Sequence, residues 1–299
     1  MTESFAALVP QRWTRGDDRW PPGFEDLGPD QPDSLWLAGG DQLEPYRTIA
    51  VVGSRNASVW GKMCARDVGR SLSEQGLCVI SGLARGIDAG ALAGALKGPV
   101  PPVAVLGNGL PGIYPPENLR LAQEMVAAGG ALVSEYPQGT PPKGFHFPRR
   151  NRLISAWAEA VVVVEATLRS GSLGTAHRAQ EMGRSVLTFP GAVGDGRHAG
   201  CHALIREGAL LIESTEDLLE WISTGRDPGI LEAENRRLER LWKVCGWESG
   251  SGSEADVDSL IDLQRQTGWS AAFLLQVWWR WQQSRVLRSS TAPEDQGQV

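Results

Sequence analysis

The stretch Thr48-Ile49-Ala50-Val51-Val52-Gly53 decides the fold class of this chain. It is a short, almost entirely apolar run that ends at glycine, which is the pattern of a β-strand buried on both faces. A helical pattern follows over residues 59–75, and Gly76 stands where the C-cap of a helix favours glycine. A buried strand that leads into a helix is the unit from which parallel sheets are built.

The same alternation repeats towards the C-terminus. Its clearest member is Val161-Val162-Val163-Val164-Glu165, which we interpret as a central strand. The repeat predicts an α/β fold with a doubly wound, mostly parallel sheet over residues 48–223. Further strands are expected at 77–81, 103–106, 131–133, 185–189 and 209–212, and further helices at 87–96, 117–128, 171–182, 201–206 and 215–222.

The two flanks of residues 48–223 differ from this pattern. Residues 1–47 are rich in Pro, Asp and Trp without a sustained period, which predicts an irregular N-terminal lead-in. Residues 224–256 predict a helix and a flexible linker, and residues 257–299 predict a small helical appendage. The tryptophans within residues 278–281 favour packing or partner docking over DNA reading for that appendage.

The composition is that of an ordinary globular protein. Of 299 residues, 41% are hydrophobic and 21% are charged, which supplies enough apolar material for a substantial core. We expect a cytoplasmic protein without a membrane span, since no apolar run approaches about 18 residues and the N-terminus lacks a signal-peptide pattern. Four scattered cysteines without a C-x-x-C pair are expected to be reduced thiols: Cys64, Cys78, Cys201 and Cys245.

The charge distribution permits a polyanionic partner. The net charge is −6, but the acidity lies in the flanks, where residues 1–47 carry 9 acidic and 4 basic side chains. Residues 48–223 carry 15 acidic and 16 basic side chains. This central region therefore needs only to segregate its charges to present a positive face.

The densest cationic stretch is Lys143-Gly144-Phe145-His146-Phe147-Pro148-Arg149-Arg150-Asn151-Arg152. It holds four positive charges, two phenylalanines and no carboxylate. Cations beside aromatic rings suit single-stranded nucleic acid, whose phosphates need counter-charge and whose unstacked bases need flat partners. The alternative interpretation is a solvated loop whose phenylalanines turn into the core.

Loops rich in glycine and serine follow four of the predicted strands. Ligands of open parallel sheets bind at the carboxyl ends of the strands, where glycine lets the backbone approach a phosphate and helix N-termini present free N–H groups. Arginine adds bidentate contacts to phosphate oxygens. The sequence therefore predicts an anionic ligand. The loops span residues 53–56, 81–88, 107–112 and 165–175.

Other ligands and chemistries fit less well. Gly107-x-Gly109-x-x-Gly112 matches the dinucleotide fingerprint by spacing, but Pro111 interrupts it and no helix follows directly. The chain has no P-loop motif and no G-x-S-x-G nucleophile motif. The run from His198 to His202 resembles a metal cluster only by composition. We therefore predict no cofactor and no metal.

Several short motifs follow one another along the chain in a fixed order. They include Val52-Gly-Ser-Arg55, Ser81-Gly-Leu-Ala-Arg-Gly-Ile-Asp88, Tyr114-Pro-Pro-Glu-Asn118, Ser134-Glu-Tyr-Pro137, Phe147-Pro-Arg-Arg-Asn-Arg152, Ser170-Gly-Ser172 and Leu204-Ile-Arg-Glu-Gly-Ala209. Together these motifs resemble the DNA-processing protein A (DprA/Smf) family, over about residues 20–215. The resemblance implies an extended Rossmann-like fold that binds single-stranded DNA, protects incoming strands and loads a RecA-type recombinase during natural transformation, usually as a homodimer and without catalysis. It also implies that residues 257–299 are a degenerate winged-helix-like segment.

The resemblance also implies site residues. DNA phosphates would be contacted by basic side chains, namely Arg55, Lys143, Arg149, Arg150 and Arg152. Phe145 or Phe147 would lie near bases, and a backbone cradle would be formed by Gly53, Ser54, Gly82 and Gly86. The predicted site is completed by Arg85, Asn151, Ser170 and Gly171, with Asn151 fixing the loop. The chain departs from the family pattern at Leu92 and Pro111.

A nucleotide phosphoribohydrolase of the lysine-decarboxylase-like group is the alternative function. Those enzymes carry P-G-G-x-G-T-x-x-E, whose glutamate serves catalysis. The matching window here runs from Ser170 to Arg178 and places arginine where the carboxylate is needed. Because this chemistry lacks its essential group, we favour the DNA-binding function.

Overall fold

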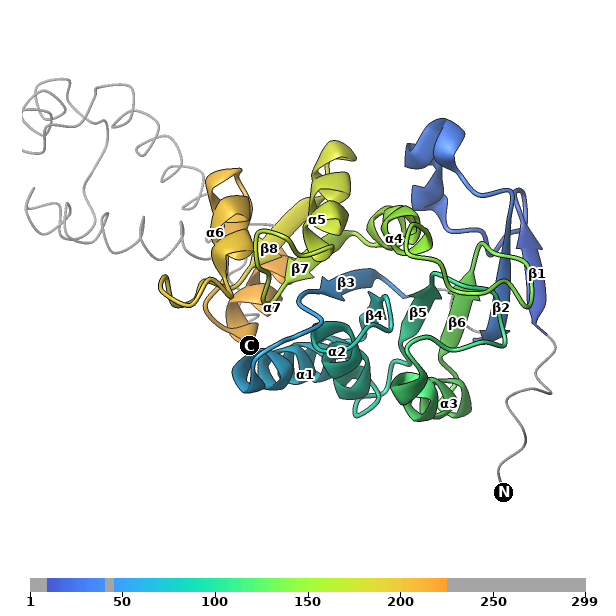
Figure 1. The fold of residues 1–299 in the computed structure, drawn as a ribbon, viewed down its shortest axis with the longest axis horizontal. Coiled ribbons are helices and arrows are strands. Elements are labelled where there is room, and N and C mark those ends of the chain that lie inside the picture. The colour runs from blue at the N-terminus through green and yellow to red at the C-terminus, as the bar shows by residue number, and fades with distance from the viewer. Residues whose placement is uncertain (1–9, 41–45, 225–299) are drawn as a thin grey trace, which may run out of the picture. The chain divides into compact units, whose positions relative to one another are not determined.

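The computed structural model describes residues 10–40 and 46–224. They form one nine-stranded sheet in the order β1-β2-β6-β5-β4-β3-β7-β8-β9 (Figure 1). Strands β3 to β9 are parallel, which confirms the predicted α/β sheet. The strands are β1 (Gln11–Thr14), β2 (Ser34–Gly39), β3 (Thr48–Val52), β4 (Cys78–Ser81), β5 (Val103–Leu106), β6 (Ala131–Ser134), β7 (Ala160–Val163), β8 (Ser185–Thr188) and β9 (Leu210–Leu211).

Helices cover both faces of the sheet (Figure 1). Helices α1, α2, α3 and α7 pack on one face, and α4, α5, α6 and the 3-10 helix η2 pack on the other. The helical stretches predicted within residues 48–223 are all present, with ends shifted by a few residues. Their bounds are η2 (Pro22–Asp30), α1 (Val59–Glu74), α2 (Ile87–Ala95), η3 (Pro116–Asn118), α3 (Leu119–Ala127), α4 (His146–Trp157), α5 (Ser172–Glu181), α6 (Ala199–Arg206) and α7 (Thr215–Thr224).

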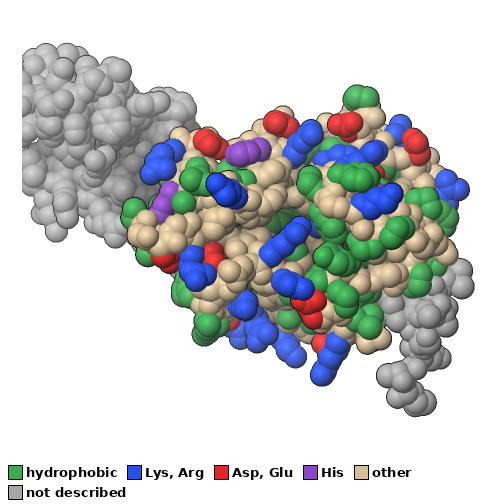
Figure 2. All heavy atoms as spheres, viewed as in Figure 1, with side chains coloured by type: hydrophobic (Ala, Val, Ile, Leu, Met, Phe, Trp, Pro, Cys, Tyr) green, Lys and Arg blue, Asp and Glu red, His purple; other side chains and the backbone are tan. Residues whose placement is uncertain are grey.

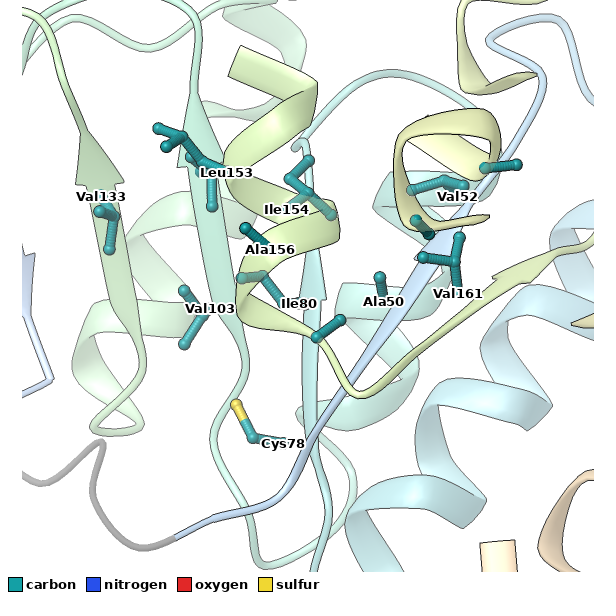
Figure 3. Packing of buried hydrophobic residues seen from close by; sticks show 14 of the residues in the cluster. Ala50, Val52, Cys78, Ile80, Val103, Val133, Leu153, Ile154, Ala156 and Val161 are labelled. Atoms are coloured by element: carbon teal, nitrogen blue, oxygen red, sulfur yellow. The ribbon is translucent and has the colours of Figure 1, made fainter. Parts of the chain in front are cut away.

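The apolar strands are buried on both faces, as their sequences predict. Along β3, Ala50 and Val52 pack into the core under α4 and α5, whereas Ile49 and Val51 pack towards α1 and α2. Figure 3 shows Ala50 and Val52 in the first of these cores, together with Leu153 of α4. This alternation explains why the strand has no polar face.

The N-terminal lead-in was predicted to be irregular, and this is wrong for much of residues 10–40. Strands β1 and β2 pair antiparallel, and β2 pairs antiparallel with β6, so they extend the sheet at that edge. Leu35 and Leu37 of β2 are fully buried. The two strands were not predicted because they are short and are separated by the proline-rich η2, so no hydrophobic period is sustained along this segment.

The basic stretch at residues 143–152 is also not a loop throughout. Helix α4 begins at His146 and continues to Trp157. Pro148 lies in its first turn, where the missing N–H leaves no helical hydrogen bond unmade. Four consecutive basic or amide side chains therefore point in different directions around a helix, at about 100° per residue.

Two further expectations concern the ends of the chain and membranes. The predicted linker and appendage, residues 225–299, lie outside the described residues. Among the helices that are described, none has the length and apolar character needed to cross a bilayer.

The contact between α1 and α2 supplies a stability prediction. A Cβ added at Gly69 would overlap the backbone oxygen of Ala91, which cannot move aside easily. We expect Gly69→Ala to lower the free energy of unfolding by about 3 kcal/mol, measured by urea denaturation. Gly174 in α5 is the matched control, since a Cβ there meets nothing within 4 Å. Gly174→Ala should raise that free energy by about 0.5–1 kcal/mol, and equal effects of both changes would contradict the packing argument.

Candidate nucleic-acid interface

A groove of about 830 Å³ opens at the carboxyl edge of the parallel strands. The strand order reverses between β3 and β7, which is where open α/β sheets bind their ligands. The groove is bounded by the segments that follow β3, β4, β5, β7 and β8 and by the start of α4. Its lining includes Gly53, Ser54, Arg55, Asn56, Tyr114, Gly144, Phe147, Arg150, Asn151, Glu165, Arg169, Ser170, Gly171 and Arg197.

The loop after β3 is fixed by its neighbours. Ser54 donates its backbone N–H to the Glu165 carbonyl at 2.6 Å, and Ile87 donates to the Ser54 carbonyl at 3.2 Å. A Cβ at Gly53 would lie 2.6 Å from the Ile87 side chain and 2.8 Å from the Glu165 carbonyl, so only glycine fits there. This packing holds Arg55 at the rim of the groove.

The Arg55 guanidinium contacts an aromatic ring and no carboxylate among the described residues. Its guanidinium carbon lies 5.4 Å from the centroid of the Phe147 ring, which is a cation–π contact. The Tyr114 ring also contacts Phe147, with the two ring centroids 5.4 Å apart. Within residues 10–40 and 46–224, Arg55 forms no ion pair with a carboxylate, so its charge is available to a ligand.

Lys143 and Phe145 form a second cation–aromatic pair before α4. The Lys143 Nζ lies 6.0 Å from the Phe145 centroid, and Phe145 is 66% exposed. An exposed ring on a surface is free to stack on a base, while Lys143 can reach a phosphate. Figure 2 shows Lys and Arg side chains spread over the face in view, with a run of them from its middle to its lower edge.

The three arginines of α4 do not share one role. Arg149 is exposed, and its nearest carboxylate, that of Glu135, lies 3.8 Å away. Arg152 is buried and makes a bidentate pair with the same Glu135, with contacts of 2.9 and 2.7 Å. It also donates to the Asp30 carbonyl at 3.0 Å. Because its donors are used inside the protein, we withdraw the prediction that Arg152 contacts DNA phosphates.

Arg150 also differs from the role that was predicted for it. Although it reaches the groove floor, it is only 3% exposed and donates to the carbonyls of Gly82, at 2.8 Å, and Val105. The buried Asp88 is its electrostatic neighbour. Burial raises the pKa of the Asp88 carboxyl, and the Arg150 charge opposes that rise, as do N–H donors from Ala84 and Gly82. Arg150 thus organises the floor, where direct phosphate contact had been predicted.

The loop after β4 does not form the predicted backbone cradle. A Cβ at Gly82 would lie 2.5 Å from Arg150 Nη2, and one at Gly86 would overlap the Ser54 carbonyl. Both glycines are therefore needed for internal packing, and neither lines the groove. Arg85 is exposed but pairs with Glu117, away from the groove lining. Residues 53–56, in contrast, line the groove.

The loop after β7 is joined to α4. Asn151 donates to the Gly171 carbonyl at 3.2 Å, which agrees with its expected loop-fixing role. Ser170 and Gly171 line the groove, and the Ser170 and Ser172 hydroxyls lie 2.7 Å apart. These residues stand at the N-terminus of α5, whose free N–H groups and dipole favour an anion.

Glu165 is a buried carboxylate in the groove floor, but its oxygens are occupied. It accepts hydrogen bonds from the Ser58 N–H at 3.1 Å and from the Ser58 hydroxyl at 2.6 Å. Ser58 in turn accepts from the Gly61 N–H as the N-cap of α1. Glu165 therefore anchors α1 to β7. Arg178, which stands where a phosphoribohydrolase needs its glutamate, pairs with Glu181 on α5.

Three cationic or aromatic residues of the groove lining were not among the predicted site residues: Tyr114, Arg169 and Arg197. Tyr114 and Arg169 lie within stretches already singled out as motifs or strand-end loops. Arg197 belongs to the loop after β8, which the carboxyl-edge rule would also have included. Among the residues that the structure describes, the neighbourhood of His198 and His202 included, no three or more His, Cys, Asp or Glu side chains are grouped as metal ligands would be.

The chain matches known proteins over this part of its length. The family model described as DNA recombination-mediator protein A matches residues 11–223. Protein Smf of Escherichia coli strain K12 is 45% identical over 196 residues, which cover 66% of this chain and 52% of that protein. DNA processing protein DprA of Streptococcus pneumoniae is 42% identical over 203 residues, covering 68% and 71%. The chain therefore spans about half the length of the first relative and more of the second.

Solved structures agree with these matches. The X-ray structure of DNA processing protein A from Streptococcus pneumoniae superposes with a TM-score of 0.65 at 39% identity, covering 72% of this chain and 75% of that one. DNA processing protein A from Helicobacter pylori, whose structure is described for its single-stranded DNA binding mode, gives 0.65 at 25% identity, with coverages of 74% and 98%. On the family match and these identities, the chain belongs to the DNA recombination-mediator protein A family.

Proposed function

We propose that this chain binds single-stranded DNA in the groove at the carboxyl edge of its sheet. The observation that carries the proposal is the pairing of unneutralised cations with accessible aromatic rings: Arg55 over Phe147, and Lys143 beside Phe145. Phosphates would bind the cations and unstacked bases would lie on the rings. Membership of the recombination-mediator family also supports single-stranded DNA binding, as does the binding mode described for the Helicobacter pylori relative.

The proposal extends to a biological role. The strand held in the groove would be protected and passed to a RecA-type recombinase during natural transformation, by a cytoplasmic homodimer that performs no catalysis. The family description as a recombination mediator supports this role. The carboxylates of the groove also favour binding over catalysis, because Glu165 is held by Ser58 and Asp88 lies beside Arg150.

A salt-titrated binding assay tests the proposed function. We expect a labelled single-stranded oligonucleotide to bind more tightly than the duplex of the same sequence, because the rings need unstacked bases. The logarithm of the affinity should fall linearly with the logarithm of salt concentration, by about 0.7 for each phosphate contacted. Absence of binding, or an affinity independent of salt, would refute the proposal. Release of free base from a nucleoside monophosphate would favour the phosphoribohydrolase instead.

A further inference from the structure

The groove continues beyond Arg55 towards the loops after β7 and β8, where the sequence had placed only Ser170 and Gly171 in the site. Phe147 packs on Gly107 in the loop after β5, whereas Arg197 lies in the loop after β8. The order β5-β4-β3-β7-β8 separates these loops by four strand spacings, or about 19 Å. At about 3.4 Å per stacked nucleotide, this span exceeds what one phosphate and one base would occupy.

Two exposed arginines stand in this second half of the groove. Arg169 follows β7 and has no ion pair with any residue that the structure describes. Arg197 lies 3.7 Å from the Asp195 carboxylate and 4.0 Å from Glu165. An exposed pair such as Arg197 with Asp195 is weak, so a phosphate can displace it. Both arginines can therefore bind phosphates of a polyanion that runs from the end of β3 towards the end of β8.

The aromatic side chain next to this half of the groove is Trp60, which packs against His198, the chain neighbour of Arg197, and is not itself among the groove-lining residues. Trp60 lies in the first turn of α1, between Ser58 and Gly61, which both contact Glu165 in the groove floor. It is 48% exposed. The Phe189 ring meets it at 78° and 6.1 Å, and the buried His198 ring meets it at 61° and 5.4 Å. Held edge-to-face by two neighbours, this ring is fixed in place before any ligand arrives.

We infer that Trp60, Arg169 and Arg197 form a second arm of the DNA groove, the first arm being the part around Arg55 and Phe147. In the second arm Trp60 stacks on a base and the two arginines bind the flanking phosphates. The inference rests on the proposed function and adds to it a longer path for the strand. Fixed aromatic platforms bind bases of any sequence, because every base has a stacking face. A DNA strand bound by both arms would run from Phe147 to Trp60, across the point between β3 and β7 at which the order of the β-strands reverses.

Substitutions of Trp60 test this arm. Trp60→Leu keeps an apolar side chain against Phe189 and His198 but removes the stacking face, so single-stranded DNA should bind about tenfold more weakly. Trp60→Phe should recover most of the loss. Met63→Ala is the matched control, because Met63 is an exposed apolar residue of the same helix that lines a different hollow beside α2 and α3. It should bind DNA like the wild type.

Arg197→Ala gives an independent readout. It should reduce the slope of log affinity against log salt by about 0.7, the value for one phosphate on a single strand. Arg206→Ala removes the same charge from the other end of α6 and should leave the slope unchanged. Thermal unfolding of each variant shows that the fold is retained.

The outcomes separate this inference from the proposed function. If wild-type protein does not bind single-stranded DNA, the proposed function fails. If Arg55→Ala weakens binding while Trp60→Leu and Arg197→Ala bind like the wild type, the second arm is refuted. Cross-linking of a 5-iodouracil oligonucleotide to wild-type protein provides a measurement without substitution. A Trp60 adduct supports the arm, and adducts confined to Phe145 and Phe147 refute it.

Discussion

Replacing Arg55 and Lys143 together by alanine will weaken the binding of single-stranded DNA by at least about 100-fold. Each side chain offers a charge-assisted contact to phosphate, worth about 1.5–3 kcal/mol when it is lost. Neither has a carboxylate partner within the described residues, so no internal ion pair is broken and folding should be unaffected. The slope of log affinity against log salt should fall by about 1.4, the value for two phosphates. Fluorescence anisotropy across a salt series measures both quantities.

The matched control removes one lysine and one arginine elsewhere. Lys97 follows the C-terminus of α2 and Arg206 ends α6, so both lie at the opposite edge of the sheet from the groove. Lys97→Ala with Arg206→Ala changes the net charge equally and should alter affinity only slightly. A double variant of Arg55 and Lys143 that binds like this control at every salt concentration would show that the groove is not the DNA site.

Arg152→Ala will destabilise the protein by about 3–5 kcal/mol while leaving the DNA affinity of the folded protein unchanged. The change leaves the Glu135 carboxylate buried without its bidentate partner, which is far more costly than losing an exposed pair. It also frees the Asp30 carbonyl, so the contact between α4 and the N-terminal segment is weakened. Urea denaturation gives the free energy of unfolding, and anisotropy in the absence of urea gives the affinity.

Arg149 supplies the comparison for this prediction. It lies three residues earlier in the same helix and approaches the same carboxylate, but it is exposed. Arg149→Ala should therefore cost less than about 1 kcal/mol. Combining Arg152→Met with Glu135→Gln should recover part of the stability, because no buried charge is then left unpaired. If Arg152→Ala instead keeps its stability and lowers the salt slope, the original assignment of Arg152 to a phosphate was right.

The fold was predictable where its signal is local. The run at residues 48–52 is apolar on both faces, and burial on both faces is what places a strand inside a parallel sheet. Helix ends were also encoded locally, as Gly76 shows by its positive φ of 78° just after α1. Strands β1 and β2 were missed because β1 pairs with β2, and β2 joins the sheet by pairing with β6, which lies far along the sequence.

The candidate site was predictable in place but not in detail. The rule that ligands bind at the carboxyl ends of strands identified residues 53–56 and 165–175, and both ranges contribute to the groove. The same glycine-rich signal was misleading at Gly82 and Gly86. A glycine needed for close internal packing and one needed to approach a phosphate are identical in sequence, and only the neighbouring atoms distinguish them.

The sequence by itself determined the α/β sheet, the edge of that sheet where ligands bind, and the concentration of positive charge at residues 143–152. Only the tertiary structure decided which of those charges can meet DNA. Helix α4 turns Arg149 outward, Arg150 towards carbonyls of two strand ends, and Arg152 onto Glu135. The physical reason is that composition counts charges, whereas availability to a ligand depends on partners that other strands and loops bring into contact.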